Sequence, residues 1–258
     1  MRRNNTAIVT GGGRGIGRAI CQELAEAGVD IAIADLDADL MEETAALVED
    51  AGQEAYPIET DLADFDSVRD SVDRAYACCG DVDILVNNAG IAGPTAACEE
   101  IDPEEWDATL NVNLRGPFYT CREVLPAMKE RGYGRIVNIA SVTGKRPLVN
   151  RTPYAAAKMG LIGFTRTLAA EVGQRDINVN AICPGSVDGP RIRKVFERQA
   201  EATGQSYEAV EEAVKAESAR GELVDKEEVA HTVRYLCSEA ARQVTGQDIN
   251  VSAGKVMY

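Results

Sequence analysis

Short apolar runs alternate with helix-like segments along almost the whole chain, and this alternation constrains the fold most. Runs rich in Val, Ile and Ala recur seven times, at residues 6–10, 30–34, 55–58, 84–87, 135–140, 178–183 and 249–251. Helical patterns occupy the segments between them, at residues 17–27, 38–50, 67–78, 106–131, 154–171 and 227–238. Because the runs are apolar on both faces, they predict a parallel sheet covered by helices on each side. We therefore expect one doubly wound, Rossmann-like α/β domain with seven strands over residues 1–258.

Two helix starts can be read from local chemistry. Asp102 is followed by Pro103 and, three positions on, by Glu105, while Asp225 is followed by Glu228 at the same spacing. An acid before the first turn and a Glu three residues later form a capping box, and proline suits the first helical position. Both aspartates are predicted to cap their helices through their side chains.

Charge excludes several classes of partner. Acidic residues outnumber basic ones 42 to 27, so the net charge is −15, which disfavours binding to nucleic acid or to anionic membranes. No apolar run approaches eighteen residues and the N-terminus has no signal-peptide core, so a cytoplasmic location is expected. The acid excess, with Arg strongly favoured over Lys, fits either a salt-rich cytoplasm or an ordinary acidic surface.

Cysteine and histidine usage limits the chemistry. The chain has 7 Cys, an odd number without C-x-x-C spacing, and 1 His, His231. No disulfide framework, metal site or Ser-His-Asp triad is expected.

A glycine-rich turn follows the first apolar run. Residues 10–17 read Thr-Gly-Gly-Gly-Arg-Gly-Ile-Gly and lead into a helix. Glycines let the main chain approach a pyrophosphate, and the helix N-terminus supplies N–H donors and a positive dipole. The turn predicts a dinucleotide site that uses Gly11, Gly13, Arg14, Gly15, Ile16 and Gly17.

An acidic residue ends the second run, eighteen positions after Gly17. At this place the Asp35 carboxylate would accept hydrogen bonds from the adenosine ribose and repel a 2′-phosphate. Arg14 favours the opposite preference, because a cation could pair with that phosphate. We give Asp35 the greater weight and predict NAD as cofactor, with NADP second.

Tyr154 and Lys158 stand four residues apart at a helix start, so both project from one face. An ammonium about 5 Å from a phenol, at an effective dielectric near 20, favours the phenolate by roughly 3 kcal/mol. The tyrosine pKa would fall from about 10 to about 8, which suits an acid–base catalyst near neutral pH.

Further motifs complete a pattern. The glycine turn, Asn87-Asn88-Ala89-Gly90, Asn113, Ser141, the Tyr154–Lys158 pair and Pro184-Gly185 together resemble the short-chain dehydrogenase/reductase family. The resemblance implies that Tyr154 exchanges a proton with the substrate oxygen and that Ser141 hydrogen-bonds that oxygen. Lys158 would assist Tyr154 and hold the nicotinamide ribose, and Asn113, which fits the spacing better than Asn111, would anchor a water.

The same resemblance extends the cofactor site to residues after several strands: Asp61, Leu62, Asn88, Ala89, Gly90, Pro184, Gly185 and Val187. Two positions depart from the family pattern. Gly189 stands where a Thr commonly bonds the nicotinamide carboxamide, and Ser252-Ala253-Gly254 replaces Asp-Gly-Gly.

Residues 188–223 form a charged, helix-prone insertion between the sixth and seventh runs, where a substrate lid is expected. Arg191, Arg193 and Lys194 could pair with an anionic substrate group or simply form a solvated face; Arg191 and Ser141 are the candidate substrate contacts.

These features predict an NAD-dependent oxidoreductase that interconverts a secondary alcohol, such as a polyol, sugar or hydroxy acid, and a ketone. The alternatives are a 3-oxoacyl-thioester reductase and a non-enzymatic dinucleotide-binding regulatory subunit. The resemblance also implies a homotetramer that uses the two long helices and the C-terminal strand.

Overall fold

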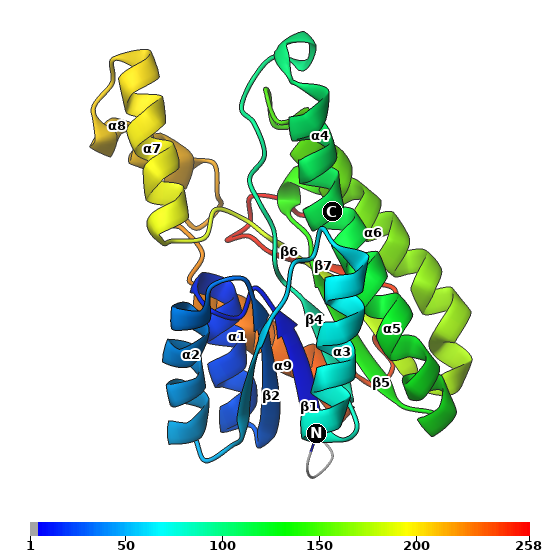
Figure 1. The fold of residues 1–258 in the computed structure, drawn as a ribbon. Coiled ribbons are helices and arrows are strands. Elements are labelled where there is room, and N and C mark those ends of the chain that lie inside the picture. Colours follow the sequence, from blue (N-terminus) through cyan, green and yellow to red (C-terminus); the bar gives the residue numbers. More distant parts are fainter. Residues whose placement is uncertain (1–4) are drawn as a thin grey trace.

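The computed structural model describes residues 5–258, without the side chains of Arg191, Arg198 and Ala202. One parallel sheet runs through the molecule in the order β3-β2-β1-β4-β5-β6-β7 (Figure 1). Its strands are β1 Asn5–Thr10, β2 Val29–Asp35, β3 Ala55–Glu59, β4 Ile84–Asn87, β5 Gly134–Ile139, β6 Ile177–Pro184 and β7 Asp248–Val251. The predicted doubly wound sheet of seven strands is confirmed.

Helices cover both faces of this sheet (Figure 1). One face carries α1 Gly15–Glu26, α2 Ala38–Asp50 and α9 Lys226–Cys237; the other carries α3 Phe65–Cys79, α5 Gly116–Arg131 and α6 Thr152–Val172. Alternate residues of each strand serve the two layers, so that Ile31 and Ile33 pack under α1 and α2 whereas Ala32 and Ala34 face α3. Burial on both sides explains why the strands are apolar without alternation.

The helix starts at Asp102 and Asp225 are confirmed, but the predicted side-chain caps are wrong. Neither carboxylate accepts a capping hydrogen bond. Instead the N–H groups of Glu105 and Glu228 donate to the main-chain oxygens of Asp102 and Asp225, at 3.0 and 3.1 Å. These tight first-turn bonds use the donors that the carboxylates would otherwise have taken.

The long helix predicted over residues 106–131 is interrupted. Helix α4 spans Pro103–Leu110, a π-helical segment, η2, spans Asn111–Arg115, and α5 follows. The Gly116 N–H donates to the Asn111 oxygen, which is the five-residue bond of a π-helix. Local periodicity did not reveal this extra residue.

The 188–223 insertion folds as a helical pair, α7 Pro190–Thr203 and α8 Tyr207–Ala216. The pair projects beyond the sheet, opposite α4 (Figure 1). Phe196 and Val210 are fully buried, and the Phe196 ring meets the Tyr207 ring edge-on at 5.9 Å. A bridge between Val187 and Val224 closes the base of the insertion, so both of its ends leave the body at one point.

A buried hydrogen-bond network joins the centre of the sheet to α5 and α6. The Asn87 amide donates to Asn138 at 2.9 Å, and the Asn138 amide donates to Thr165 at 2.9 Å. The Thr120 hydroxyl donates to the Asn87 amide oxygen at 2.6 Å. These four side chains are at most 2 % exposed, so the network is closed to water.

All seven cysteines are free thiols. Burial raises the pKa of Cys121 and Cys237 to about 12, which keeps both protonated and unreactive.

Over residues 5–258, no helix combines the length and apolar character required to cross a membrane.

Candidate functional site

The strand order reverses between β1 and β4, and the candidate site lies where these strands end. Parallel sheets form a ligand crevice at such a reversal, outside the carboxyl ends of the strands. Here Thr10 and Asn88 join the two loops: the Thr10 hydroxyl accepts the N–H groups of Asn88 and Ala89 at 3.0 and 3.1 Å, and the Asn88 amide lies within 3.1 Å of the Thr10 and Gly11 carbonyl oxygens. The wall of the crevice is therefore fixed by neutral hydrogen bonds.

The glycine turn connects β1 to α1 at this edge. A methyl carbon on Gly17 would lie 2.0 Å from the Gly11 carbonyl oxygen, so no larger residue fits there. Arg14, which is exposed, stands at the N-cap, and Ile16 packs partly against the core. The turn and the helix N-terminus have the form needed to receive a pyrophosphate.

Two side chains that the sequence did not single out brace the turn from outside. The Arg18 guanidinium donates to the Gly13 carbonyl oxygen at 2.6 Å and to Glu43 at 2.7 Å. The Thr44 hydroxyl lies 3.1 Å from the Gly12 and Gly13 carbonyl oxygens. Both supports come from helices α1 and α2, and no local motif marks them.

Asp35 ends β2 beside this turn. Its carboxylate accepts the Gly13 N–H at 3.0 Å and the Leu36 N–H at 2.8 Å. The half-buried carboxylate is thus fixed where the predicted ribose contact requires an acceptor.

Asp61 follows β3 and borders a hollow on the same side of the molecule. Leu36, Asp61 and Arg74 are among its lining residues. Leu36 is 64 % exposed, and Leu62, the next residue after Asp61, is buried. The hollow offers an apolar side chain and polar groups together, as an adenine ring requires.

Tyr154 and Lys158 face each other on the first turns of α6. The Lys158 Nζ lies 5.7 Å from the centroid of the Tyr154 ring and donates to the Ile139 carbonyl oxygen at 2.8 Å. Lys158 is 4 % exposed, whereas Tyr154 is half-buried. The predicted proximity of the phenol and the ammonium is therefore present.

Asn113 projects inward from the π-helical segment toward the same lysine. Its amide nitrogen donates to the carbonyl oxygens of Ile91 and Thr109, at 3.0 and 2.9 Å. A methyl carbon on Gly90 would lie 2.6 Å from Asn113 Oδ1 and 3.6 Å from Lys158 Nζ, so Gly90, Asn113 and Lys158 meet at one point. Asn111, by contrast, pairs with Arg115 on the helix surface. The buried Oδ1 of Asn113 has no hydrogen-bond partner within the protein, and a bound water would satisfy it.

Ser141 follows β5 and begins the short helix η3, Val142–Gly144. Its Oγ accepts the Thr143 N–H at 3.1 Å, so its own O–H remains a donor. A methyl carbon on Gly144 would lie 2.9 Å from the main chain of Lys158 and Met159. The serine turn is therefore pressed directly against the first turns of α6.

The loop after β6 completes this edge. Gly185 donates its N–H to Val251 at 2.9 Å, and Val187 packs against the main core. Pro184, Gly185 and Val187 thus lie at the base of the insertion. The glycine turn, Asp35, Ser141, Tyr154 and Lys158 all belong to this one edge of the sheet.

The three cationic residues predicted in the insertion differ in their surroundings. Arg193 pairs with Asp188 at 3.2 Å, and Lys194 is exposed. Arg191 lies in α7, and its side chain lies outside the described residues.

Arg151 is a cation that sequence reasoning missed. Its guanidinium carbon lies 5.3 Å from the Tyr154 ring centroid. Its position just before the start of α6 was the available signal.

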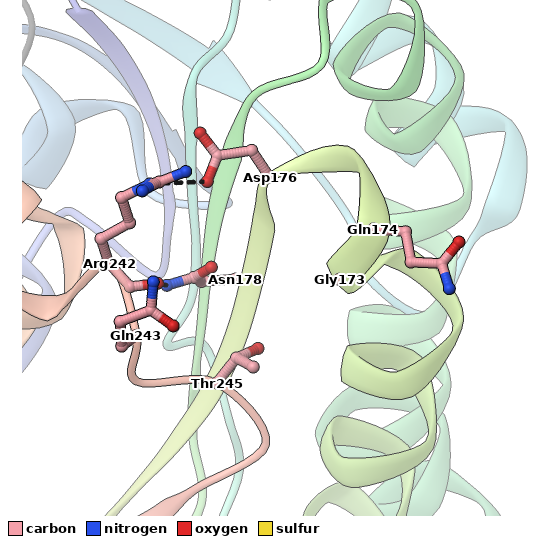
Figure 2. Close-up of a pocket in the computed structure, with 7 residues that line it drawn as sticks. All are labelled: Gly173, Gln174, Asp176, Asn178, Arg242, Gln243 and Thr245. Atoms are coloured by element: carbon pink, nitrogen blue, oxygen red, sulfur yellow. Dashed lines mark hydrogen bonds and ion pairs between the residues drawn. The ribbon is translucent and has the colours of Figure 1, made fainter.

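A second hollow occupies the opposite edge of the sheet, where β6 begins (Figure 2). Its lining includes Asp176, Asn178 and Arg242, with an ion pair between Asp176 and Arg242 at 3.6 Å. The Asn178 amide lies within 3.2 Å of three carbonyl oxygens of the chain. The hollow is remote from Tyr154 and contributes nothing to the candidate site.

Comparison with known proteins decides which family has this arrangement. The family described as short chain dehydrogenase matches residues 5–201. The chain belongs to that family. Its members bind a nicotinamide dinucleotide and act as oxidoreductases on CH–OH groups, and this chain is such an enzyme.

Relatives cover the full length of this short-chain dehydrogenase. It is 38% identical over 258 residues to the D-beta-hydroxybutyrate dehydrogenase of Cupriavidus necator, covering 99% of each chain. A crystal structure of a variant of actinorhodin polyketide ketoreductase with NADPH superposes with a TM-score of 0.95 at 36% identity, over 99% of this chain and 98% of that one. NAD+-bound xylitol dehydrogenase superposes with a TM-score of 0.93 at 29% identity, over 98% and 100%.

Proposed function

We propose that this short-chain dehydrogenase interconverts a secondary alcohol and a ketone with NAD as cofactor, and that Tyr154 moves the substrate proton. The proposal depends on the Lys158 ammonium, which lies 5.7 Å from the Tyr154 ring centroid at the carboxyl edge beside Ser141. The fixed glycine turn and the acceptor at Asp35 support a dinucleotide there. When bound, the nicotinamide ring supplies the hydride acceptor.

Each side chain has a definite part in this proposal. Ser141 donates its O–H to the substrate oxygen, and the Thr143 N–H holds the Ser141 oxygen in place for that bond. Lys158, held by the Ile139 carbonyl oxygen, stabilises the Tyr154 phenolate, which takes the hydroxyl proton of the alcohol. Asn113 holds a water beside Lys158, so the proton has a route to solvent.

NAD is favoured over NADP by the place of Asp35. Its carboxylate is anchored by two main-chain N–H groups, so it cannot move away from an added phosphate without losing both. Repulsion between two fixed negative groups is costly in a partly desolvated site. Asp61, Leu62, Asn88, Ala89, Gly90, Pro184, Gly185 and Val187 complete the proposed cofactor contacts.

Reduction of a 3-oxoacyl thioester is the second candidate. The same Ser141, Tyr154 and Lys158 would serve it, and a ketoreductase with NADPH is among the similar structures. Initial rates with NAD+ and NADP+ on polyols, sugars and hydroxy acids, set against reduction of acetoacetyl thioesters, separate the two. Turnover restricted to thioesters with NADPH would overturn the dehydrogenase proposal.

The insertion and the assembly belong to the same proposal. We infer that the α7–α8 pair closes over the substrate, because both its ends emerge beside the loop after β6.

A homotetramer is supported by exposed apolar side chains on the long helices, Phe118 and Met159, which are 46 % and 52 % exposed. Light scattering at low and at molar salt would test the tetramer, and parallel activity assays would test the salt requirement.

A further inference from the structure

Arg151 lies directly against the side chain proposed as the proton acceptor. It is the N-cap residue of α6, three positions before Tyr154. Its guanidinium carbon is 5.3 Å from the Tyr154 ring centroid, and its Nη2 donates to the Ala92 carbonyl oxygen at 2.6 Å. The guanidinium therefore connects the loop after β4 to the first turn of α6.

The main chain before Arg151 is shaped to place it there. Asn150 has φ 62°, in the left-handed region, and its carbonyl oxygen accepts the Ala96 N–H at 3.1 Å. Non-glycine residues adopt this conformation uncommonly, although Asn does so more easily than most. The turn lies between η3 and α6, and Arg151 follows it directly, in contact with the Tyr154 ring.

The electrostatic setting is unusual for this chain. The protein carries a net charge of −15, yet the Tyr154 ring has two cations within 5.7 Å, Lys158 and Arg151. One ammonium is sufficient to stabilise the phenolate. A guanidinium differs from an ammonium because its planar fork of donors matches the two oxygens of a carboxylate.

We propose that Arg151 binds an oxyanion group of the substrate, one or two carbons away from the reacting hydroxyl. The inference rests on the proposed function, since it takes the reacting oxygen to lie on Tyr154 and Ser141. A substrate oxygen at Tyr154 brings its near neighbours to the stacked guanidinium. Among the classes in the proposal, a short hydroxy acid has such a group, whereas a neutral polyol or sugar lacks one.

Other roles for Arg151 would change ligand binding in a different way. If the guanidinium acted only on the Tyr154 phenolate, its removal would affect anionic and neutral substrates alike. If it only held the loop at Ala92, ligand binding would fall for both as well. An oxyanion site changes the ratio between a charged ligand and its neutral analogue.

Calorimetry on the enzyme saturated with NAD+ measures that ratio without turnover. The ligands are acetoacetate, methyl acetoacetate and acetonesulfonate, which share the ketone and differ in the group two carbons away. We expect the wild type to bind acetoacetate at least tenfold more tightly than its methyl ester, and Arg151→Met to remove this advantage. The sulfonate distinguishes a planar carboxylate fit from general anion affinity.

Two variants control the measurement. Arg151→Lys keeps the charge and should retain part of the preference even if Arg151→Met destabilises the fold. Arg122→Met removes another stacked arginine, on α5, whose guanidinium carbon lies 4.9 Å from the Phe65 ring centroid, and should bind like the wild type.

The inference is overturned if the wild type binds acetoacetate and its ester equally, or if Arg151→Met weakens both by the same factor. Its failure is separable from that of the proposed function. Neutral alcohols oxidised in a Tyr154-dependent way, with no preference for anions, would remove only the role of Arg151. Anion binding that depends on Arg151, without turnover of any alcohol, would remove only the proposed reaction.

Discussion

The inner wall of the crevice and the insertion that faces it are held by different kinds of interaction. Neutral hydrogen bonds among Thr10, Asn87, Asn88 and Asn138 fix the wall. At the base of the insertion, ion pairs add to the main-chain bridge between Val187 and Val224. Glu217 accepts Arg146, from the segment after η3, at 3.0 Å and Lys255, from the segment after β7, at 3.0 Å. Closed neutral networks are insensitive to salt, whereas exposed ion pairs are weak and screened. The wall that carries the groups proposed for chemistry therefore relies on buried neutral hydrogen bonds, whereas the insertion relies in part on ion pairs that salt weakens.

Glu217 is charged at neutral pH in this setting. Burial by itself raises the pKa of its carboxyl, but Lys255 and Arg146 outweigh that effect and hold the pKa below its ordinary value. Lys255 also lies 3.3 Å from the Ser186 hydroxyl. Glu217 therefore links the insertion to the segment after η3 and, through Lys255, to the loop after β6.

Replacing Tyr154 should have the largest effect on turnover, because it removes the proposed proton acceptor. Tyr154→Phe should lower kcat by about 10³-fold, because general acid–base catalysis is lost, while NAD+ affinity measured by fluorescence stays unchanged. Tyr235→Phe, at an exposed position of α9, is the control. Retained turnover would show that the proton acceptor is another group.

Asp35→Ala tests whether the wall selects the cofactor. Loss of a charged acceptor should raise the KM for NAD+ by about 30-fold, from roughly 2 kcal/mol, and should improve the relative use of NADP+. Asp39→Asn, in the first turn of α2, provides the comparison. Equal losses with both cofactors would mean that Asp35 only braces the glycine turn.

Asn138→Ala should lower the free energy of unfolding by about 2 kcal/mol, because the buried Asn87 amide loses its acceptor and the Thr165 oxygen loses its donor. Thermal unfolding followed by circular dichroism should show a decrease in Tm of about 5 °C. Asn111→Ala, which removes a surface contact to Arg115, should change little. A similar stability for both variants would contradict the importance assigned to the buried network.

Glu217→Gln should act on recognition and leave chemistry intact. The KM for the alcohol should rise about threefold with kcat nearly unchanged. Added salt should raise the wild-type KM and leave that of the variant flat. Glu212→Gln, on α8, should keep the wild-type salt response, because in the described contacts Glu212 pairs only within the insertion, with Lys215. A fall in kcat equal to that of Tyr154→Phe would instead mean that Glu217 affects the chemical step.

Asp248 provides the smallest effect, and it depends on pH. Burial raises the pKa of its carboxyl, but Lys145 at 2.6 Å and Arg166 at 2.6 Å outweigh it and lower the pKa below the ordinary 3.8. A lowered pKa stabilises the fold above 3.8, and that contribution disappears as the pH falls through the native value. Urea unfolding should therefore separate wild type from Asp248→Asn at pH 6, and the difference should shrink as the pH falls below 3.8. A constant difference would exclude the charge as its cause.

The sequence predicted those parts of the molecule whose signals are local. Strands buried on both faces are continuous apolar runs, so their positions were found to within one or two residues. Asp35, Tyr154 and Lys158 carry side chains whose chemistry and spacing suffice to propose a role, whereas the role of Ser141 came from the family resemblance. Thr44 was missed because the turn that it supports lies 31 residues earlier in the chain. Arg18 follows the turn directly, but its contacts with Glu43 and Thr44 exist only in the folded chain. Arg151 was missed because only the folded loop sets it against the phenol.

The direction of the Asn113 side chain depends on the one additional residue that the π-helical segment contains. Each residue of a regular helix turns the side-chain direction by about 100°, and one additional residue between α4 and α5 shifts every side chain before it relative to those after it. Deleting a single residue from Asn111–Arg115 would restore the ordinary repeat and rotate Asn113 out of line with Lys158, even though both side chains would still be present. A change in the length of this helix would therefore remove the water site proposed for Asn113 without changing the type of any residue beside Lys158.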